Sequence, residues 1–147
     1  MKHQNQLQLI KSKQIMKFFL LLTAIIPAYS CNTPQKSPVV IEWIAPAAAS
    51  SVSNPLKDDA AAAQEGKKTF TQMCAVCHGE KGKGDGAAGI ALTPKPGNFT
   101  LVKTQSQTDG AIFWKMSEGR APMASYKAAL SAVQRWQLVN YIRTFKK

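Results

Sequence analysis

The stretch that decides the fold of this chain is Cys74-Ala75-Val76-Cys77-His78. On a helical turn, residues i and i+3 lie on one face, so the two thiols can reach the two vinyl groups of one porphyrin and form thioether bonds. The imidazole of the next residue, His78, then turns toward the centre of the ring as the proximal ligand of the iron. The string therefore predicts one covalently attached haem c, held by Cys74, Cys77 and His78.

Helical patterns flank this string on both sides. The helix starts that the residue types favour are Asp58 or Asp59, Thr108 or Asp109, and Ser131 with Gln134 as a capping box. The first helix is expected to run on to Cys77, and the second to stop at Gly119. In the last helix, apolar residues recur at i, i+3, i+4 and i+7, namely Leu138, Tyr141, Ile142 and Phe145. We expect an all-α domain with about three to four helices packed around the haem and no sheet.

The first part of the chain has the composition of an export signal. The chain has 147 residues, 45% of them hydrophobic, which is enough for one core. The apolar run over residues 18–28 has about half of the roughly 20 residues that span a bilayer as a helix. It follows three lysines and leads into small residues and Cys31, an order typical of a secretory signal peptide. We expect a signal peptide over residues 1–30, with Met16 as an alternative start of the chain.

Cys31 follows this leader directly. It resembles the lipid-modified cysteine of bacterial lipoproteins, so we expect lipidation at Cys31 and a place at the periplasmic face of a bacterial membrane. Residues 31–57 are rich in Pro, Ala and Ser and indicate a tether. The apolar stretch 39–44 within it would either lie against the domain or dock a partner. The domain itself is expected over residues 58–147.

Two other uses of a Cys-x-x-Cys pair fit this chain less well. A thioredoxin-like redox pair favours a βαβ context, whereas the flanking pattern here is helical. A structural zinc site needs four ligands, usually Cys and His. The chain has three Cys and two His. Apart from Cys31 and the motif residues Cys74, Cys77 and His78, no Cys or His follows the leader. Haem attachment is therefore the interpretation that these counts favour.

The same counting narrows the choice of the sixth iron ligand. His3 is lost with the leader, which excludes ligation by two histidines within one subunit. Of the five methionines, Met1 and Met16 belong to the leader, and Met73 adjoins Cys74 on the proximal side. Met116 falls in a helical pattern, where core packing is the simpler role. Met123 follows a glycine and a proline in irregular backbone, so we expect Met123 as the ligand unless the position is open.

Several motifs, in the same order, resemble those of class I (mitochondrial-type) cytochromes c, specifically the small bacterial monohaem ones. The resemblance covers about residues 60–147. Its motifs are Gly66-Lys67-Lys68-Thr69-Phe70, the haem string with Gly79, Gly84-Asp85-Gly86, Leu92-Thr93-Pro94, residues 119–123, and residues 136–143. It implies a cytochrome c-like fold and one-electron transfer rather than catalysis.

The resemblance also implies two sets of contacts. Gly66 and Phe70 of the first helix would cross the last helix at Tyr141. The proximal histidine would hydrogen-bond to the carbonyl oxygen of a loop proline, for which Pro94 is the candidate and Pro96 the alternative. The chain departs from the family pattern directly after Met123, where an alanine stands in place of the common proline.

The charge points to anionic partners. The chain carries 19 basic and 8 acidic residues, a net charge of +11, and four of the lysines lie in the leader. The basic residues that could ring the exposed haem edge are Lys67, Lys68, Lys81, Lys83, Arg120 and Lys127. We expect them to steer redox proteins with acidic docking surfaces, at rates that fall with salt. Nucleic acid is not an expected partner, because no recognition motif is present.

Three functions remain open from the sequence. The first is an electron carrier between respiratory-chain partners, because an iron with ligands on both faces has no position for substrate. The second is the haem subunit of a larger membrane oxidoreductase, docked through residues 39–44. The third is a ligand-binding haem sensor or a peroxidase with a labile Met123.

Overall fold

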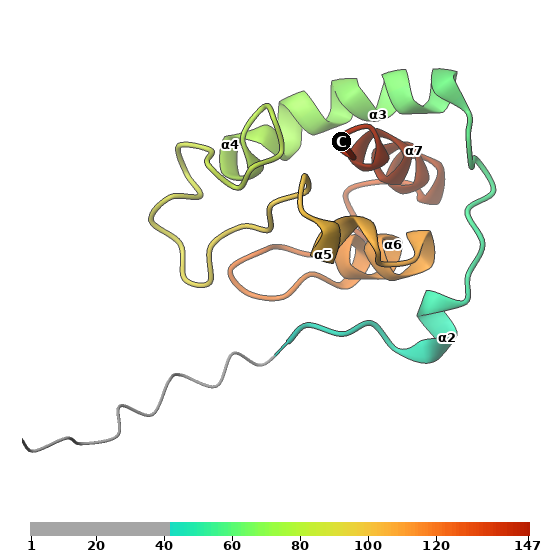
Figure 1. Cartoon of the computed structure of the whole chain (residues 1–147), viewed down its shortest axis with the longest axis horizontal. Helices are drawn as coiled ribbons and strands as arrows, with labels where there is room; N and C mark the ends of the chain where they lie inside the picture. The colour runs from blue at the N-terminus through green and yellow to red at the C-terminus, as the bar shows by residue number, and fades with distance from the viewer. Residues whose placement is uncertain (1–41) are drawn as a thin grey trace, which may run out of the picture. The chain divides into compact units, whose positions relative to one another are not determined.

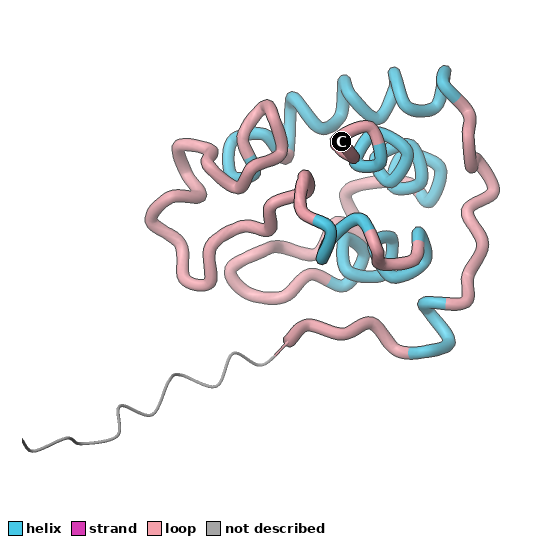
Figure 2. Tube along the Cα trace, viewed as in Figure 1, coloured by secondary structure: helices cyan, strands magenta, loops and turns pink. Residues whose placement is uncertain are grey.

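Three long helices form the body of residues 42–147, the part of the chain that the computed structural model describes. They are α3 (Ala60–Met73), α6 (Asp109–Glu118) and α7 (Ala132–Arg143). There are also three helices of four residues each. α2 (Ala47–Ser50) precedes α3, and α4 (Ala75–His78) and α5 (Val102–Gln105) lie between α3 and α6. Figure 1 shows their arrangement, and Figure 2 shows that loops make up the rest of this part, which contains no strand. The expected all-α fold is confirmed.

Side-chain caps begin the three long helices where the sequence predicted them. The Asp59 carboxylate accepts a hydrogen bond from a first-turn backbone N–H at 3.0 Å, and the Thr108 hydroxyl accepts one at 3.1 Å. Ser131 and Gln134 form the capping box. Each such cap stabilises its helix by about 1 kcal/mol, because it satisfies a backbone donor that the helix leaves open.

Two helix ends shape the site. The first helix was expected to continue to Cys77, but α3 ends at Met73, and Cys74 (φ −113°) separates it from α4. α6 ends at Gly119, as expected, where φ is +68°. Glycine adopts this left-handed backbone without the steric cost that a Cβ would bring.

The core is centred on the crossing of α3 and α7, which lie side by side in Figure 1. A Cβ on Gly66 would stand 2.0 Å from the carbonyl oxygen of Gln137, so only glycine lets the two backbones come this close. The Phe70 ring lies edge-on to Tyr141, with centroids 5.1 Å apart. These contacts confirm the crossing that the family resemblance implied. Phe70 is 1% exposed, and burial of a side chain of this size stabilises the fold by about 1.5–3 kcal/mol.

Residues 42–57, which we expected to belong to a tether, lie against the helices. Gly110 at the start of α6 faces the backbone of α2, since a Cβ there would stand 2.3 Å from the carbonyl oxygen of Ala49. The Asn54 side chain donates to Asp109 Oδ2 at 3.0 Å and to Asn140 Oδ1 at 2.7 Å. These contacts place this segment within the folded domain.

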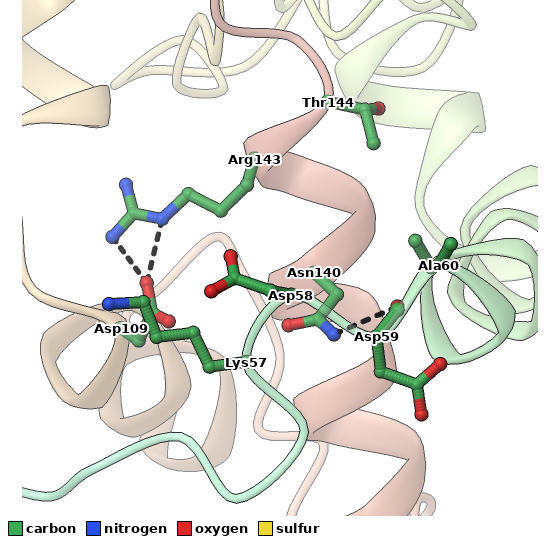
Figure 3. A pocket seen from close by; sticks show the side chains of 9 residues that line it. Lys57, Asp58, Asp59, Ala60, Asp109, Asn140, Arg143 and Thr144 are labelled. Atoms are coloured by element: carbon green, nitrogen blue, oxygen red, sulfur yellow. Dashed lines mark hydrogen bonds and ion pairs between the residues drawn. The ribbon is translucent and has the colours of Figure 1, made fainter.

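A shallow pocket marks where the segment reaches α7 (Figure 3). Asn140 projects from α7 and donates to the backbone carbonyl oxygens of Leu56 and, at 3.3 Å, Asp59. Beside it, the Arg143 guanidinium forms a 2.6 Å ion pair with Asp109 of α6. Because Arg143 also donates to two backbone carbonyls of residues 105–107, α7 ties together the segment before α3 and the start of α6.

The loop of residues 79–101, between α4 and α5, has no buried side chain. Its buried residues are all glycines: Gly79, Gly82, Gly86 and Gly89. The loop returns to the motif turn through backbone bonds, from the Gly86 N–H to the Cys77 carbonyl at 3.1 Å and from the Ala88 N–H to the Val76 carbonyl at 2.9 Å. It therefore wraps the turn closely without a hydrophobic core of its own.

The predictions for the start of the chain concern residues that are not described. The signal peptide over residues 1–30, the lipidated Cys31 and the first part of the apolar stretch 39–44 all lie outside residues 42–147. Within residues 42–147, no helix is long and apolar enough to cross a membrane.

Candidate functional site

The motif turn has the geometry that its spacing predicted. The N–H groups of Cys77 and His78 both donate to the Cys74 carbonyl oxygen, at 3.1 and 2.9 Å. This single helical turn brings positions 74 and 77 to one face. Both thiols are free and half-buried. Gly79 (φ +74°) ends the turn, and a Cβ at this position would stand 2.0 Å from the Asp85 carboxylate.

Burial favours the neutral forms of Cys74 and His78 in the turn. Burial, with a smaller contribution from Cys77, raises the pKa of the Cys74 thiol to about 11. Burial also lowers the pKa of His78, against the opposite effect of a backbone hydrogen bond. The His78 Nδ1–H donates to the carbonyl oxygen of Gly97 at 3.1 Å, because a carbonyl can only accept. Nε2 therefore keeps its lone pair, which is the state that a metal-ligating histidine needs.

The partner of His78 differs from the one we expected. We expected the carbonyl of Pro94, or else that of Pro96, and the structure has Gly97 instead. Pro94 is exposed. The Pro96 carbonyl oxygen faces Gly84, where a Cβ would stand 2.4 Å from it. The Pro96 carbonyl is thus directed toward Gly84, and the carbonyl of the next residue, Gly97, reaches the imidazole.

Phe99 is a site residue that the sequence analysis did not identify. Its ring stacks on the His78 imidazole, with centroids 4.5 Å apart and planes at 18°. It also contacts Phe70 edge-on at 6.1 Å and stacks on Phe145 at 6.2 Å. Phe99 thus joins the proximal imidazole to the aromatic side of the core. A lone aromatic residue in a polar loop was the signal available in the sequence.

The two candidate methionines occupy different surroundings. Met116 is 6% exposed on α6 and belongs to the core cluster with Ile112. Met123 is half-buried in the loop after α6 and packs against the edge of that cluster. Its backbone is paired with Arg120 in both directions, at 3.0 and 2.9 Å. Core packing explains the position of Met116. Met123 lies instead in a hydrogen-bonded turn outside the helices.

The residues of this region fit a covalently bound haem. Two free thiols stand on one helical turn, and the next residue offers an imidazole nitrogen with a fixed tautomer. Apolar side chains near the turn are more than half exposed, with Val76 at 55% and Ile90 at 58%. Such side chains suit an apolar ring that the polypeptide itself does not cover.

Two solved structures contain chains similar to this one. One is the reducing HAO-like protein complex Kustc0457/Kustc0458 of Kuenenia stuttgartiensis, with 32% sequence identity and a TM-score of 0.50. The likeness covers 56% of this chain and 42% of that one, so this chain spans less than half of its length. The second is the c-type cytochrome KustC0563, with 29% identity over 56% of this chain and 98% of that one, at a TM-score of 0.48. No curated protein sequence matches the chain.

The family comparison decides the assignment. The family model described as cytochrome c oxidase, cbb3-type, subunit III, matches residues 61–142, which is more than half of the chain. The match begins in α3, contains the whole motif turn and ends in α7. It confirms the resemblance to small class I-like c-type cytochromes and the covalent haem c. The chain therefore belongs to this family, and the match supports haem-based electron transfer by the matched residues.

Proposed function

We propose that this protein is a one-electron carrier whose single haem is attached to Cys74 and Cys77 and whose iron is ligated by His78 and Met123. The observation that carries the proposal is the motif turn. Its imidazole donates Nδ1–H to Gly97 and keeps Nε2 for a metal. His78 is the only histidine after residue 3, so the second ligand from this chain is a methionine.

The chain's own residues would set the properties of the haem. When bound, the haem supplies a one-electron couple between ferrous and ferric iron. The thioether of Met123 favours the ferrous form and so raises the reduction potential. Phe99, stacked on the His78 imidazole, would hold the plane of this ring, and the Gly97 carbonyl would make the imidazole a stronger donor. With ligands on both faces, no position is left for a substrate.

Replacement of each methionine tests the ligation. Met123→Ala should abolish the weak far-red sulfur-to-iron band of the oxidised holoprotein, because it removes the ligand sulfur. Met116→Leu is the matched control and should keep the band, because it replaces core volume with similar volume. If Met116→Leu loses the band and Met123→Ala keeps it, Met116 is the ligand.

We also propose that the protein is exported and anchored to the periplasmic face of a bacterial membrane through acylated Cys31. The order of basic, apolar and small residues before Cys31 supports this. Two or more acyl chains would give stable attachment. Treatment of cells with globomycin should make the precursor accumulate. Unchanged processing would show that Cys31 is not lipidated.

The partners we propose are redox proteins with acidic docking surfaces. The six expected basic residues are all exposed, which supports the proposal. Lys68 and Lys127, however, already form ion pairs with Glu65 and Glu118, at 2.7 and 3.4 Å. Steering would therefore rest mainly on Lys67, Lys81 and Lys83. The second-order rate with the donor should fall as ionic strength rises, and a rate that ignores salt would contradict steering.

A second candidate is the haem subunit of a larger oxidoreductase. The family description names a subunit, and one similar structure is of a multi-protein complex. Co-purification with other chains after mild solubilisation would support the subunit, whereas a monomer active as a shuttle would support the free carrier. Binding of carbon monoxide to the native reduced protein would instead favour a sensor or peroxidase with a labile Met123.

A further inference from the structure

An aromatic and cationic cluster surrounds Trp43, on the segment before α2. The indole lies 6.3 Å from the ring of Trp114 on α6, between ring centroids. Two cations lie over the indole, the Arg120 guanidinium at 5.1 Å and the Lys115 ammonium at 5.6 Å. A cation over the face of a tryptophan is attracted by the negative face of the ring. These four residues, the Trp43 cluster, join the segment to α6 and to the loop after it.

Arg120 connects the Trp43 cluster to the turn that carries Met123. The Arg120 N–H donates to the Met123 carbonyl at 3.0 Å, and the Met123 N–H donates to the Arg120 carbonyl at 2.9 Å. Because the two residues are joined by both of these backbone hydrogen bonds, a contact that restrains the position of Arg120 also restrains the backbone of Met123.

Backbone hydrogen bonds to α6 also anchor the loop near its two ends. The Gly119 N–H donates to the Lys115 carbonyl at 2.9 Å, and the Tyr126 N–H donates to the Met116 carbonyl at 3.1 Å. These bonds fix where the loop leaves and rejoins α6. Between them, residues 120–122 are exposed. The contact of the Arg120 side chain with Trp43 therefore restrains the middle of the loop, where Met123 stands.

We propose that Trp43 is a positioning residue for the sixth iron ligand. Trp43 holds Arg120, Arg120 holds the turn of residues 120–123, and the Met123 sulfur stays on the iron. Without the indole, the turn opens more often and an external ligand reaches the iron sooner. The inference rests on the proposed ligation by Met123. It means that the segment before α2 influences how easily an external ligand reaches the haem iron.

The test is the rate at which imidazole displaces the methionine in the oxidised holoprotein. At saturating imidazole and fixed pH, this rate reports how often the Met123 turn opens. Trp43→Ala should raise it roughly tenfold, because the cation contact and the ring packing are lost together. Trp43→Phe should restore most of the slow rate. Ile44→Ala, at an adjacent side chain that is 73% exposed, should leave it unchanged.

A double-mutant cycle tests the route through Arg120. If Trp43 acts through Arg120, then Arg120→Gln and the double variant should bind imidazole about as fast as Trp43→Ala alone. Fully additive effects on the logarithm of the rate would overturn the route.

Asn140→Ala distinguishes positioning from a general loss of stability. Asn140 holds the same segment at residues 54–59, away from the Trp43 cluster. The Asn140→Ala variant should lower the urea midpoint of the holoprotein without raising the rate at which imidazole displaces the methionine. An equal rise in Asn140→Ala and Trp43→Ala would overturn the positioning role.

Met123→Ala, measured in parallel, separates the two proposals. If the wild-type protein lacks the sulfur-to-iron band, or Met123→Ala keeps it, ligation by Met123 fails and the Trp43 inference fails with it. If the band depends on Met123 but Trp43→Ala binds imidazole at the wild-type rate, the Trp43 inference alone fails.

Discussion

The crossing of α3 and α7 and the loop of residues 79–101 are built in opposite ways. At the crossing, side chains fill the space, and Phe70, Leu138 and Val139 are at most 1% exposed. In the loop, every buried residue is a glycine, and backbone hydrogen bonds to the motif turn hold the chain. The two regions meet where Phe99 touches both Phe70 and His78.

This difference shows which half of the domain needs the cofactor. A crossing that buries large side chains gains free energy from the polypeptide alone. A loop without buried side chains gains little, and apolar residues within it stay exposed, as Ile90 does. We interpret the loop as one side of the haem-binding site, whose exposed apolar side chains the bound haem would cover. A domain of this size buries only about 60–65% of its unfolded surface, so the haem contributes a large part of the core.

Removal of the haem should have the largest effect. In the double variant Cys74→Ala with Cys77→Ala, we expect a largely unfolded chain, because the loop loses its apolar partner and the remaining core is small. Far-ultraviolet circular dichroism of the purified chain checks this, with the holoprotein as reference. Near-native helicity would contradict it and would show that the crossing folds without the loop.

Gly66→Ala should have the next largest effect. The new Cβ would stand 2.0 Å from the Gln137 carbonyl oxygen, a backbone atom that cannot rotate away, so the crossing must widen. We expect the free energy of unfolding of the holoprotein to fall by about 3 kcal/mol, the upper part of the range for overpacking. Urea unfolding measures it.

Gly97→Ala is the matched control in the loop. The nearest atom to a Cβ there is 4.0 Å away, and the carbonyl that accepts from His78 is kept. Its effect should stay within about 0.5 kcal/mol. Equal losses in the two alanine variants would show that the loop is packed as tightly as the crossing.

Phe99→Leu should have the smallest effect of the three destabilising changes, and it should act at the junction of the two regions. Leucine keeps most of the apolar volume but loses the stack on His78 and the edge contact with Phe70. Aromatic pairs of this kind are worth about 0.5–1.5 kcal/mol, so we expect a loss of about 1 kcal/mol in urea unfolding. Val102→Ala, at an exposed position, is the control and should change little. A loss as large as that of Gly66→Ala would mean that Phe99 belongs to the core of the crossing.

Features with a local cause were predictable from the sequence. The capping box at Ser131 and the stop at Gly119 depend on side chains and dihedral angles within one turn. The haem string depends on spacing within one turn as well. The contacts implied at Gly66, Phe70 and Tyr141 came from the family resemblance, and the structure confirms them.

Features that depend on distant segments were not predictable in this way. The prediction of the His78 partner was wrong, because the course of the loop through residues 94–97 decides which carbonyl reaches the imidazole. The end of α3 before Cys74 was not predicted either; the motif turn that follows it is hydrogen-bonded to residues 84–88. The place of residues 42–57 against α6 and α7 depends on partners such as Asn140, more than 80 residues away.

The sequence by itself determined the chemistry of this protein, because two thiols and an imidazole within five residues can be recognised without knowledge of the rest of the chain. Only the tertiary structure decided which distant residues contact His78 and the candidate ligand Met123. His78 meets Gly97 and Phe99, and the Met123 backbone pairs with Arg120, whose guanidinium lies over Trp43. The physical reason is range. Bond chemistry and helix spacing act over one turn, whereas a hydrogen bond or a ring contact between distant segments exists only after the chain has closed on itself.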